Sequence, residues 1–245
     1  MQAELAKIIE EAYGLFKTEP PATVGVCECD RCGWVEDPRD LLTLPLRGLA
    51  DRLFCDYNWA ANLDDQPAMA AGLWYLLPRM LELVAMGQGL SFSDPVLSLR
   101  RLTDINFRTV WPKPNIDLVD RFFDAYLLDQ IHTGCAAEGG SWRSVNEMAL
   151  PLVLAVLGGC DLDRLLRTFD SVADPVGALQ IANLRGIWLQ REKPPRFADH
   201  FLDHKPDAQL QLGAWLMRPE HARRIEAIRP LVHPDLAEML LEALA

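Results

Sequence analysis

The sequence predicts an all-α protein, and three observations support this fold class. Apolar residues recur with a period near 3.6 wherever a period can be counted, beginning with residues 5–16. Aspartate is followed by proline at 37–38, 94–95 and 174–175, where the carboxylate can cap a helix that begins at the proline. No segment shows a convincing alternation of apolar and polar residues in the manner of a strand.

The first half of the chain divides into four predicted helices and one long loop. The N-terminal helix is amphipathic, and the loop 18–37 that follows is long enough to be functional or tied down by other contacts. Asp-Pro pairs open the second and fourth helices. Pro78 lies within the third helix, so we expect a kink there or two separate helices. The expected ranges are 2–17, 38–57, 66–87 and 95–102.

The second half continues the helical pattern. An apolar stripe from Leu118 to Ile131 predicts a helix in the middle of the chain, and the sequence from Ser144 to Glu147 has the form of a capping box. The third Asp-Pro pair opens a later helix. The expected ranges are 116–133, 144–158, 161–170, 175–191, 197–204, 207–216 and 220–244.

Short connections between these helices predict antiparallel hairpins. Hairpins recur about every 40 residues, as in HEAT arrays, but the repeats share no consensus. An irregular globular bundle and a HEAT-like α-solenoid are therefore both open. We expect a single domain over residues 1–245, with a cysteine-containing loop at 18–37 and a candidate subdivision at the proline-rich segment 111–115.

The composition is that of an acidic globular protein. Half of the 245 residues are hydrophobic and 24% are charged, which provides enough apolar side chains for one large core or two small ones. The formal net charge is −11 at pH 7, whereas nucleic-acid binding relies on clustered lysine and arginine. We therefore expect no nucleic-acid partner, and a basic protein or a metal ion suits this charge better.

Two features predict a cytoplasmic protein without a membrane span. Charged residues within positions 4–11 interrupt the apolar run that an export signal would need. The longest apolar stretch, 148–160, is shorter than the roughly 20 residues that cross a bilayer. Thiols stay reduced in the cytoplasm, so we expect Cys55, Cys135 and Cys160 to be buried packing residues.

Three cysteines within six residues, Cys27, Cys29 and Cys32, are the most informative feature of the chain. The spacing from Cys29 to Cys32 allows two thiolates from one turn to reach one zinc ion, and Cys27 can supply a third. No second Cys-x-x-Cys lies nearby, so a fourth ligand would come from Cys55, a distant histidine or a partner subunit. A metal site, unligated thiols and a redox disulfide all fit this pattern.

A second candidate for metal binding is the pair His200 and His204, which lie four residues apart and hence on one face of a helix. The zinc-peptidase signature has glutamate directly after the first histidine, and Phe201 occupies that place here. We therefore interpret the pair as solvated surface. The sequence contains no nucleophile elbow, Walker loop or dinucleotide fingerprint, and it assigns no catalytic residue.

An acid-rich segment surrounds the cysteines. Between positions 28 and 65 there are nine acidic residues and four arginines, a net charge of −5. Such a segment can steer a basic partner and raise the rate of encounter, and it can equally be a solvated surface that maintains solubility. We expect the partner-binding residues to be Trp34, Asp37, Asp40 and Asp56.

Three short motifs follow one another within residues 25–90. They are Cys29-x-x-Cys32, Asp40-Leu-Leu-Thr-Leu-Pro-Leu-Arg-Gly-Leu49 and Trp74-Tyr-Leu-Leu-Pro-Arg-Met-Leu-Glu-Leu83. In this order of motifs the chain resembles a family of bacterial proteins for which no activity is established. The resemblance implies a bacterial cytoplasmic protein. Cys27 departs from the plain two-cysteine pattern, so the third thiolate is not implied by the resemblance.

These observations favour a non-enzymatic, acidic helical module that binds a basic protein, as an immunity protein or antitoxin binds its toxin. The missing catalytic motif agrees with this, although active sites need not be contiguous in sequence. The alternative is a metal-dependent enzyme, or a regulatory protein stabilised by zinc, built around Cys27, Cys29 and Cys32. Zinc is the one cofactor that the sequence suggests.

Overall fold

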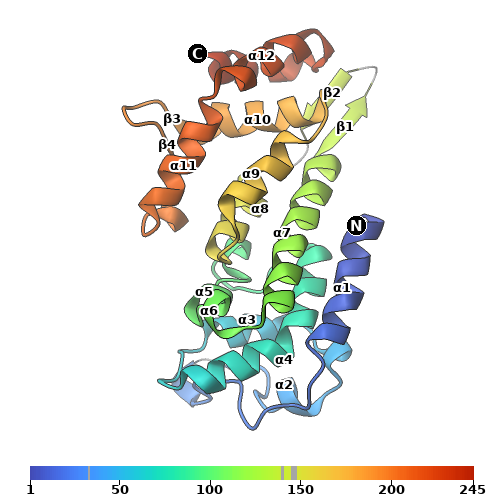
Figure 1. Ribbon diagram of the computed structural model, residues 1–245, viewed down its shortest axis with the longest axis vertical. Coiled ribbons are helices and arrows are strands. Elements are labelled where there is room, and N and C mark those ends of the chain that lie inside the picture. The colour runs from blue at the N-terminus through green and yellow to red at the C-terminus, as the bar shows by residue number, and fades with distance from the viewer. Residues whose placement is uncertain (33, 139–140, 145–147) are drawn as a thin grey trace. The chain divides into compact units, whose positions relative to one another are not determined.

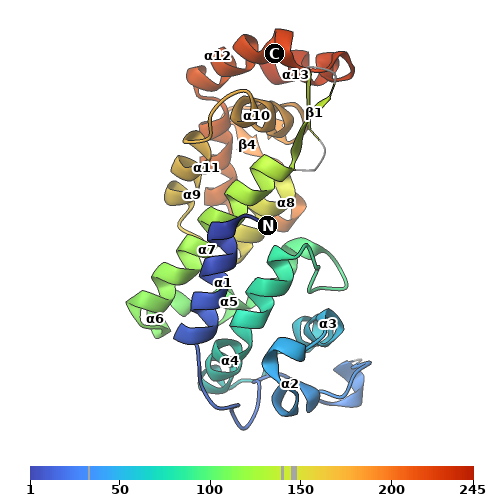
Figure 2. The ribbon, with the colours of Figure 1, turned by 90° about the vertical axis from the view of Figure 1, so that its right-hand side faces the viewer.

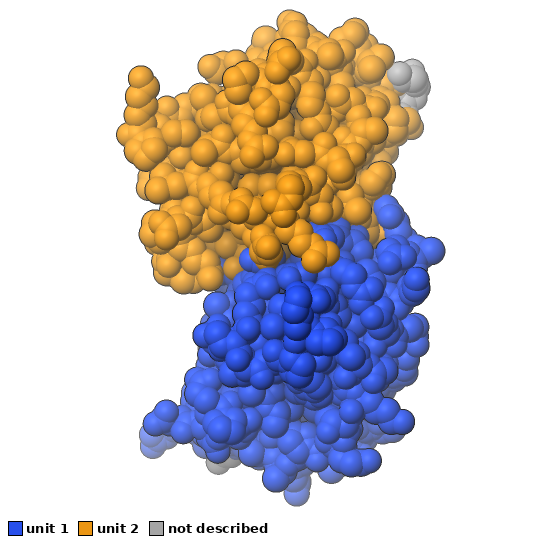
Figure 3. Space-filling model, viewed as in Figure 1, with its two compact units in different colours: residues 1–125, 157–160 blue, residues 126–156, 161–245 orange. Residues whose placement is uncertain are grey.

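A computed structural model of the chain, which describes residues 1–32, 34–138, 141–144 and 148–245, confirms the all-α class (Figure 1). Helices dominate the described residues, which also contain two short two-stranded antiparallel sheets. The chain divides into two compact units (Figure 3). Unit 1 consists of residues 1–125 and 157–160, and unit 2 of residues 126–156 and 161–245. The first division falls between Ala125 and Tyr126, inside a helix and C-terminal to segment 111–115.

Unit 1 contains six helices and the first part of a seventh among its described residues. They are α1 (Ala3–Leu15), α2 (Asp40–Thr43), α3 (Asp51–Trp59), α4 (Gln66–Ala85), α5 (Arg101–Asp104), α6 (Phe107–Val110) and α7 (Lys113–Thr133), with 3-10 turns at Asp30–Cys32, Leu46–Gly48 and Pro95–Leu97. The helix expected over 38–57 is divided, because Pro45 forces the preceding Leu44 into an extended conformation and ends α2. Pro78 lies inside α4, which is one helix of 20 residues and is not divided there.

The core of unit 1 forms where α1 packs against α4 (Figure 2). The predicted apolar face of α1 is buried from Leu5 to Ala12. Phe16, which follows α1, packs its ring 4.8 Å from that of Trp74 in α4 and 5.3 Å from that of Trp111. These tilted and edge-to-face aromatic contacts fix the end of α1 against the middle of α4.

Two glycines hold the loop after α1 against α4. A Cβ atom on Gly72 would lie 2.5 Å from the carbonyl oxygen of Val24, so only glycine permits this approach of loop and helix. Gly25 has a φ of 73°, and a Cβ atom on this residue would lie 2.4 Å from the backbone of Met69. The long loop is thus tied to the core directly before its cysteines, as its length predicted.

Unit 2 contains the rest of α7 and most of the remaining elements. They are β1 (Cys135–Glu138), β2 (Ser141–Ser144), α8 (Ala149–Leu157, whose last residue belongs to unit 1), α9 (Leu162–Asp170), α10 (Val176–Ile187), β3 (Leu189–Gln190), β4 (Arg196–Phe197), α11 (Pro206–Leu216), α12 (Pro219–Ile228) and α13 (Ala237–Leu244), with 3-10 turns at His200–Leu202, Arg229–Leu231 and Pro234–Leu236. Within this unit α10 packs against α12 and α13. Contacts between elements that are not neighbours in sequence are typical of a globular bundle and not of a solenoid.

Four of the expected helices in unit 2 differ from the structure. In the range 175–191, α10 ends at Ile187 and the strand β3 follows. Ser144 ends β2 and α8 begins at Ala149, while the rest of the proposed capping box, residues 145–147, lies outside the described residues. The range 197–204 forms the end of β4 and a 3-10 turn. The long helix expected over 220–244 is interrupted by 3-10 turns that contain Pro230 and Pro234, whose rings cannot continue an α-helix.

One described helix, α4, has the length and apolar composition to cross a membrane. Most of this helix is buried inside unit 1, as expected for the core helix of a soluble protein.

Candidate metal centre

The structure brings the three predicted cysteines together. The sulfur of Cys29 lies 3.1 Å from that of Cys27 and 3.7 Å from that of Cys32. All three sulfurs lie within 4.8 Å of one another, and the cysteines are exposed or half-buried. The backbone explains the second distance, because the N–H of Cys32 donates to the carbonyl of Cys29 at 2.9 Å and closes one 3-10 turn between them.

This cluster has the dimensions of a thiolate metal site. Zinc–sulfur bonds of about 2.3 Å in a tetrahedron place neighbouring sulfurs about 3.8 Å apart. The Cys29–Cys32 separation matches this value, and the Cys27–Cys29 separation would open by about 0.7 Å to reach it. Cys27, Cys29 and Cys32 can therefore hold a metal ion with small side-chain movements.

Hydrogen bonds between the thiols set their protonation. The Cys27 thiol donates to the sulfur of Cys29, and this bond raises the pKa of Cys27 to about 11. The same bond, and after it the one that joins Cys29 to Cys32, lowers the pKa of Cys29. Of Cys27 and Cys29, Cys29 thus becomes a thiolate at the lower pH, and the thiolate is the form that binds metal ions and acts as a nucleophile.

Backbone hydrogen bonds hold the cysteine loop, here defined as residues 25–32 and 34–36, to the segment that follows α3. The N–H of Cys27 donates to the carbonyl of Ala61 at 2.8 Å, and that of Leu63 donates to Gly25 at 3.1 Å. The indole N–H of Trp34, which was expected to contact a partner, donates to the carbonyl of Cys27 at 2.9 Å. Trp34 is half-buried and closes the loop over the first cysteine.

The structure corrects the expected role of Asp56 as a surface residue that binds a partner. Asp56 lies in α3 and only 1% of its surface is exposed. Its Oδ2 accepts hydrogen bonds from the backbone N–H groups of Val35 at 3.1 Å and Glu36 at 3.0 Å. A carboxylate that satisfies two backbone donors fixes the C-terminal end of the cysteine loop.

An Asp56→Ala variant should therefore loosen the cysteine loop. We expect the free energy of unfolding to fall by about 1–3 kcal/mol, because two loop N–H groups lose a charged acceptor. Urea denaturation measures this loss, and hydrogen exchange should speed up at residues 34–36. In the control Asp64→Ala, which changes an exposed carboxylate, stability should stay within about 0.5 kcal/mol. Unchanged exchange in Asp56→Ala would contradict the anchoring role.

A buried arginine supports the end of α3 and the segment after it, which is hydrogen-bonded to the cysteine loop. Arg101 is 2% exposed, and its guanidinium donates to the carbonyls of Ala60 at 2.7 Å and of Tyr57, and to the side chain of Asn62. These carbonyls belong to the C-terminal end of α3, where helices leave acceptors without partners. Burial lowers the pKa of Arg101 from its ordinary value. No local pattern in the sequence indicates that this arginine is internal.

The candidates for a fourth ligand do not join the cluster. Cys55 is buried and its thiol donates to the carbonyl of Gly89 at 3.5 Å. His200 and His204 are exposed, as interpreted from the sequence, and belong to unit 2. Among the residues that the structure describes, the cluster thus consists of three sulfur ligands. A fourth position would be filled by water or by a group from another molecule.

The carboxylates near the cysteines differ in whether a neighbouring cation pairs with them. Asp37 accepts from the Nε of Arg39 at 2.9 Å, and this bond lowers its pKa to about 2. Asp40 is half-buried at the start of α2. The carboxylates of Glu28, Glu36 and Asp64 are exposed and make no hydrogen bond or salt bridge with any described residue. They supply the free negative charge on the cysteine loop and on the segment paired with it.

Comparison with protein-family models, with curated proteins and with solved structures gives no match for this chain.

Proposed function

We propose that this chain is a protein-binding module in which one zinc ion orders the cysteine loop and the carboxylates beside it meet a basic partner. The observation that carries the proposal is the spacing of the three sulfurs, which approaches that of a tetrahedral thiolate site. Thiolates select zinc over magnesium and calcium, which prefer oxygen ligands. The anchors at both ends of the loop support a structural ion better than a mobile redox pair.

Metal analysis tests the first half of this proposal. The protein should be purified under reducing conditions without added metal, and zinc should be measured together with reactive thiols. We expect one zinc per chain, and we expect three of the six cysteines to be protected from a thiol reagent until a chelator is added. Metal-free protein in which Cys27, Cys29 and Cys32 all react freely would overturn the metal site.

The second half of the proposal rests on charge. Glu28, Glu36 and Asp64 present three unpaired carboxylates on or beside the cysteine loop, within a chain of net charge −11. A field of this sign accelerates the encounter with a basic surface and selects against acidic partners. The partner is thus expected to be a basic protein, and we assign no reaction to this surface.

Charge reversal at the loop should slow the binding of such a partner. In a Glu28→Lys/Glu36→Lys/Asp64→Lys variant we expect the association rate constant to fall roughly ten-fold or more at low salt, because steering is lost. The measurement is stopped-flow or surface-plasmon kinetics with the basic partner that cross-linking identifies, at two salt concentrations.

The matched control places the same change in charge on unit 2. Glu220, Glu226 and Glu238 are exposed there, and their conversion to lysine alters the net charge equally. Binding of the control variant should slow much less than that of the loop variant. An equal effect in both variants would show that only the net charge matters and would remove the loop as the interface.

The three-ligand geometry also favours a second candidate, a metal-dependent enzyme. Catalytic zinc sites have three protein ligands and an open position that holds water, whereas structural sites are closed by four ligands. Cobalt substitution distinguishes a catalytic site with an open position from a closed structural site. The absorption spectrum of the cobalt protein should shift on adding cyanide if the fourth position is open, and should stay constant if another protein group occupies it.

A further inference from the structure

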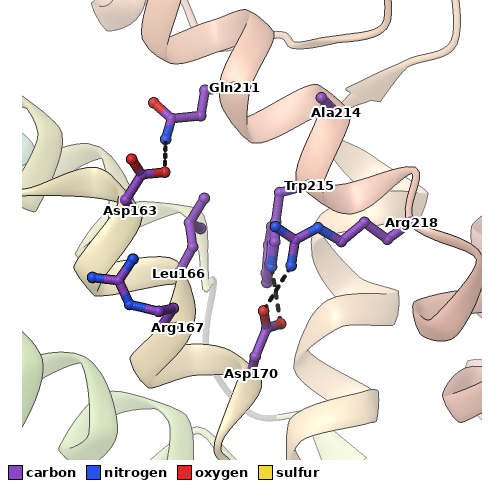
Figure 4. Close-up of a pocket in the computed structure, with 8 residues that line it drawn as sticks. All are labelled: Asp163, Leu166, Arg167, Asp170, Gln211, Ala214, Trp215 and Arg218. Carbon is purple, nitrogen blue, oxygen red and sulfur yellow. Dashed lines mark hydrogen bonds and ion pairs between the residues drawn. The ribbon is translucent and has the colours of Figure 1, made fainter.

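Unit 2 contains a cavity of about 390 Å³ that is separate from the cysteine loop. It lies between α9 and α11, and every residue that lines it belongs to this unit (Figure 4). Pockets for small ligands typically measure about 300–1,000 Å³, so the cavity has room for a small organic molecule. The proposed protein-binding function does not use it.

Three hydrogen bonds join α9 to α11 and to the residues directly after α11, at two ends of the cavity. Gln211 of α11 donates to Asp163 of α9 at 2.6 Å (Figure 4). Asp170, the last residue of α9, accepts from the indole N–H of Trp215 and from Arg218, both at 2.9 Å. Both carboxylates of the cavity therefore already have partners. The bridges fix the separation of α9 and α11 and keep the space between them preformed.

Leu166, Ala214 and Trp215 supply the apolar part of the cavity wall. Leu166 and Trp215 are 3% and 2% exposed, and the Trp215 ring packs 5.1 Å from that of Phe169 and 4.9 Å from that of His221. His221 is 1% exposed, and its Nε2 lies 3.6 Å from a carboxylate oxygen of Asp170. Burial lowers the pKa of His221 to about 4, so the ring is neutral at pH 7 and adds no charge to the cavity.

Arg167 is a cation of the cavity that has no acidic partner among the described residues. It lines the cavity from α9, it is exposed, and it makes no side-chain hydrogen bond or salt bridge with the residues that the structure describes. A guanidinium presents a planar set of donors that matches a carboxylate or a phosphate. Arg218 neutralises Asp170, and the amide of Gln211 already occupies Asp163, so Arg167 is the cation of the cavity whose donors are free for a ligand.

We propose that this cavity binds a small organic anion, a carboxylate or a phosphate monoester, whose acidic group pairs with Arg167. The apolar part of the ligand lies against Leu166, Ala214 and Trp215. The pairing of one free cation with a preformed apolar wall selects an amphipathic anion over an inorganic one.

The test uses the 245-residue chain with benzoate, phenyl phosphate and inorganic phosphate as probes. Binding is followed by the indole signals of the seven tryptophans in ¹⁵N-labelled protein, with the Trp215 signal assigned by Trp215→Phe. Benzoate or phenyl phosphate should shift the Trp215 signal in a saturable manner. In Arg167→Gln the dissociation constant should rise roughly ten-fold or more, because a charged contact is lost.

Two pairs of variants separate binding from folding. Ala214 is exposed on α11, so Ala214→Phe should fill the cavity without disturbing the core and should abolish binding. Arg223→Gln and Ala227→Phe make the same replacements at exposed positions outside the cavity and should bind as the unaltered protein does.

Three results would overturn the proposal. They are no saturable shift with either organic probe, unchanged affinity in both Arg167→Gln and Ala214→Phe, and binding of inorganic phosphate as tight as that of phenyl phosphate.

Discussion

A Cys29→Ser/Cys32→Ser variant should contain no zinc and should melt at a lower temperature, while its helical content stays the same. Two of the three sulfur ligands are removed, and serine hydroxyls do not replace thiolates at zinc. The free energy of unfolding should fall by about 3 kcal/mol when free zinc is roughly 100-fold above the dissociation constant of the intact site. Metal analysis, circular dichroism and thermal melts measure the three effects.

The matched control is Cys135→Ser/Cys160→Ser, which changes two half-buried cysteines outside the cluster. The control should keep its zinc. If chelation leaves the melting temperature of the unaltered protein unchanged, the ion does not stabilise the cysteine loop. Loss of zinc in both double variants would place the metal elsewhere in the chain.

An Arg101→Met variant should be among the least stable single substitutions in unit 1, with a loss of about 3–5 kcal/mol. Methionine fills a similar volume, but the carbonyls of Tyr57 and Ala60 at the end of α3 lose their donor in a buried position. The segment after α3 pairs with Cys27, so the affinity of the cluster for zinc should also fall. Urea denaturation and zinc titration measure the two losses.

Arg121→Met is the control for the loss of a positive charge in the same unit. Arg121 pairs with Glu11 at the surface, and exposed pairs of this kind contribute about 0–1 kcal/mol. Equal destabilisation by the two substitutions would mean that Arg101 contributes through charge alone and not by supporting α3.

The sequence predicted the parts of the fold that depend on local signals. The apolar face of α1 and the start of α9, where Asp161 accepts from the N–H of Arg164, follow from residues three or four positions apart. The β1–β2 hairpin was missed, because its four residue pairs from Cys135–Ser144 to Glu138–Ser141 involve short segments without an alternating apolar pattern. Its partner α10 is distant in sequence.

The candidate metal centre shows the same limit. Cys27, Cys29 and Cys32 cluster because they are separated by a few residues, so their proximity was predictable. Asp56 was expected at the surface because aspartate is rarely buried without partners. Its partners, the N–H groups of Val35 and Glu36, lie 21 and 20 residues away in the cysteine loop. The internal position of Arg101 depends on contacts about 40 residues apart. Pairings of this range are not encoded in any local pattern.

Residues 157–160 belong to unit 1 although the chain on either side of them belongs to unit 2. They supply the carbonyls of Leu157 and Gly159, which accept from Thr103 and, at 2.8 Å, from Arg108. During synthesis the N-terminal unit therefore cannot be completed when residue 125 leaves the ribosome, because these acceptors emerge more than thirty residues later. A gene cut at that boundary would give a first fragment that lacks residues 157–160 and the two carbonyl acceptors that they supply, so unit 1 is not encoded by one continuous stretch of the gene.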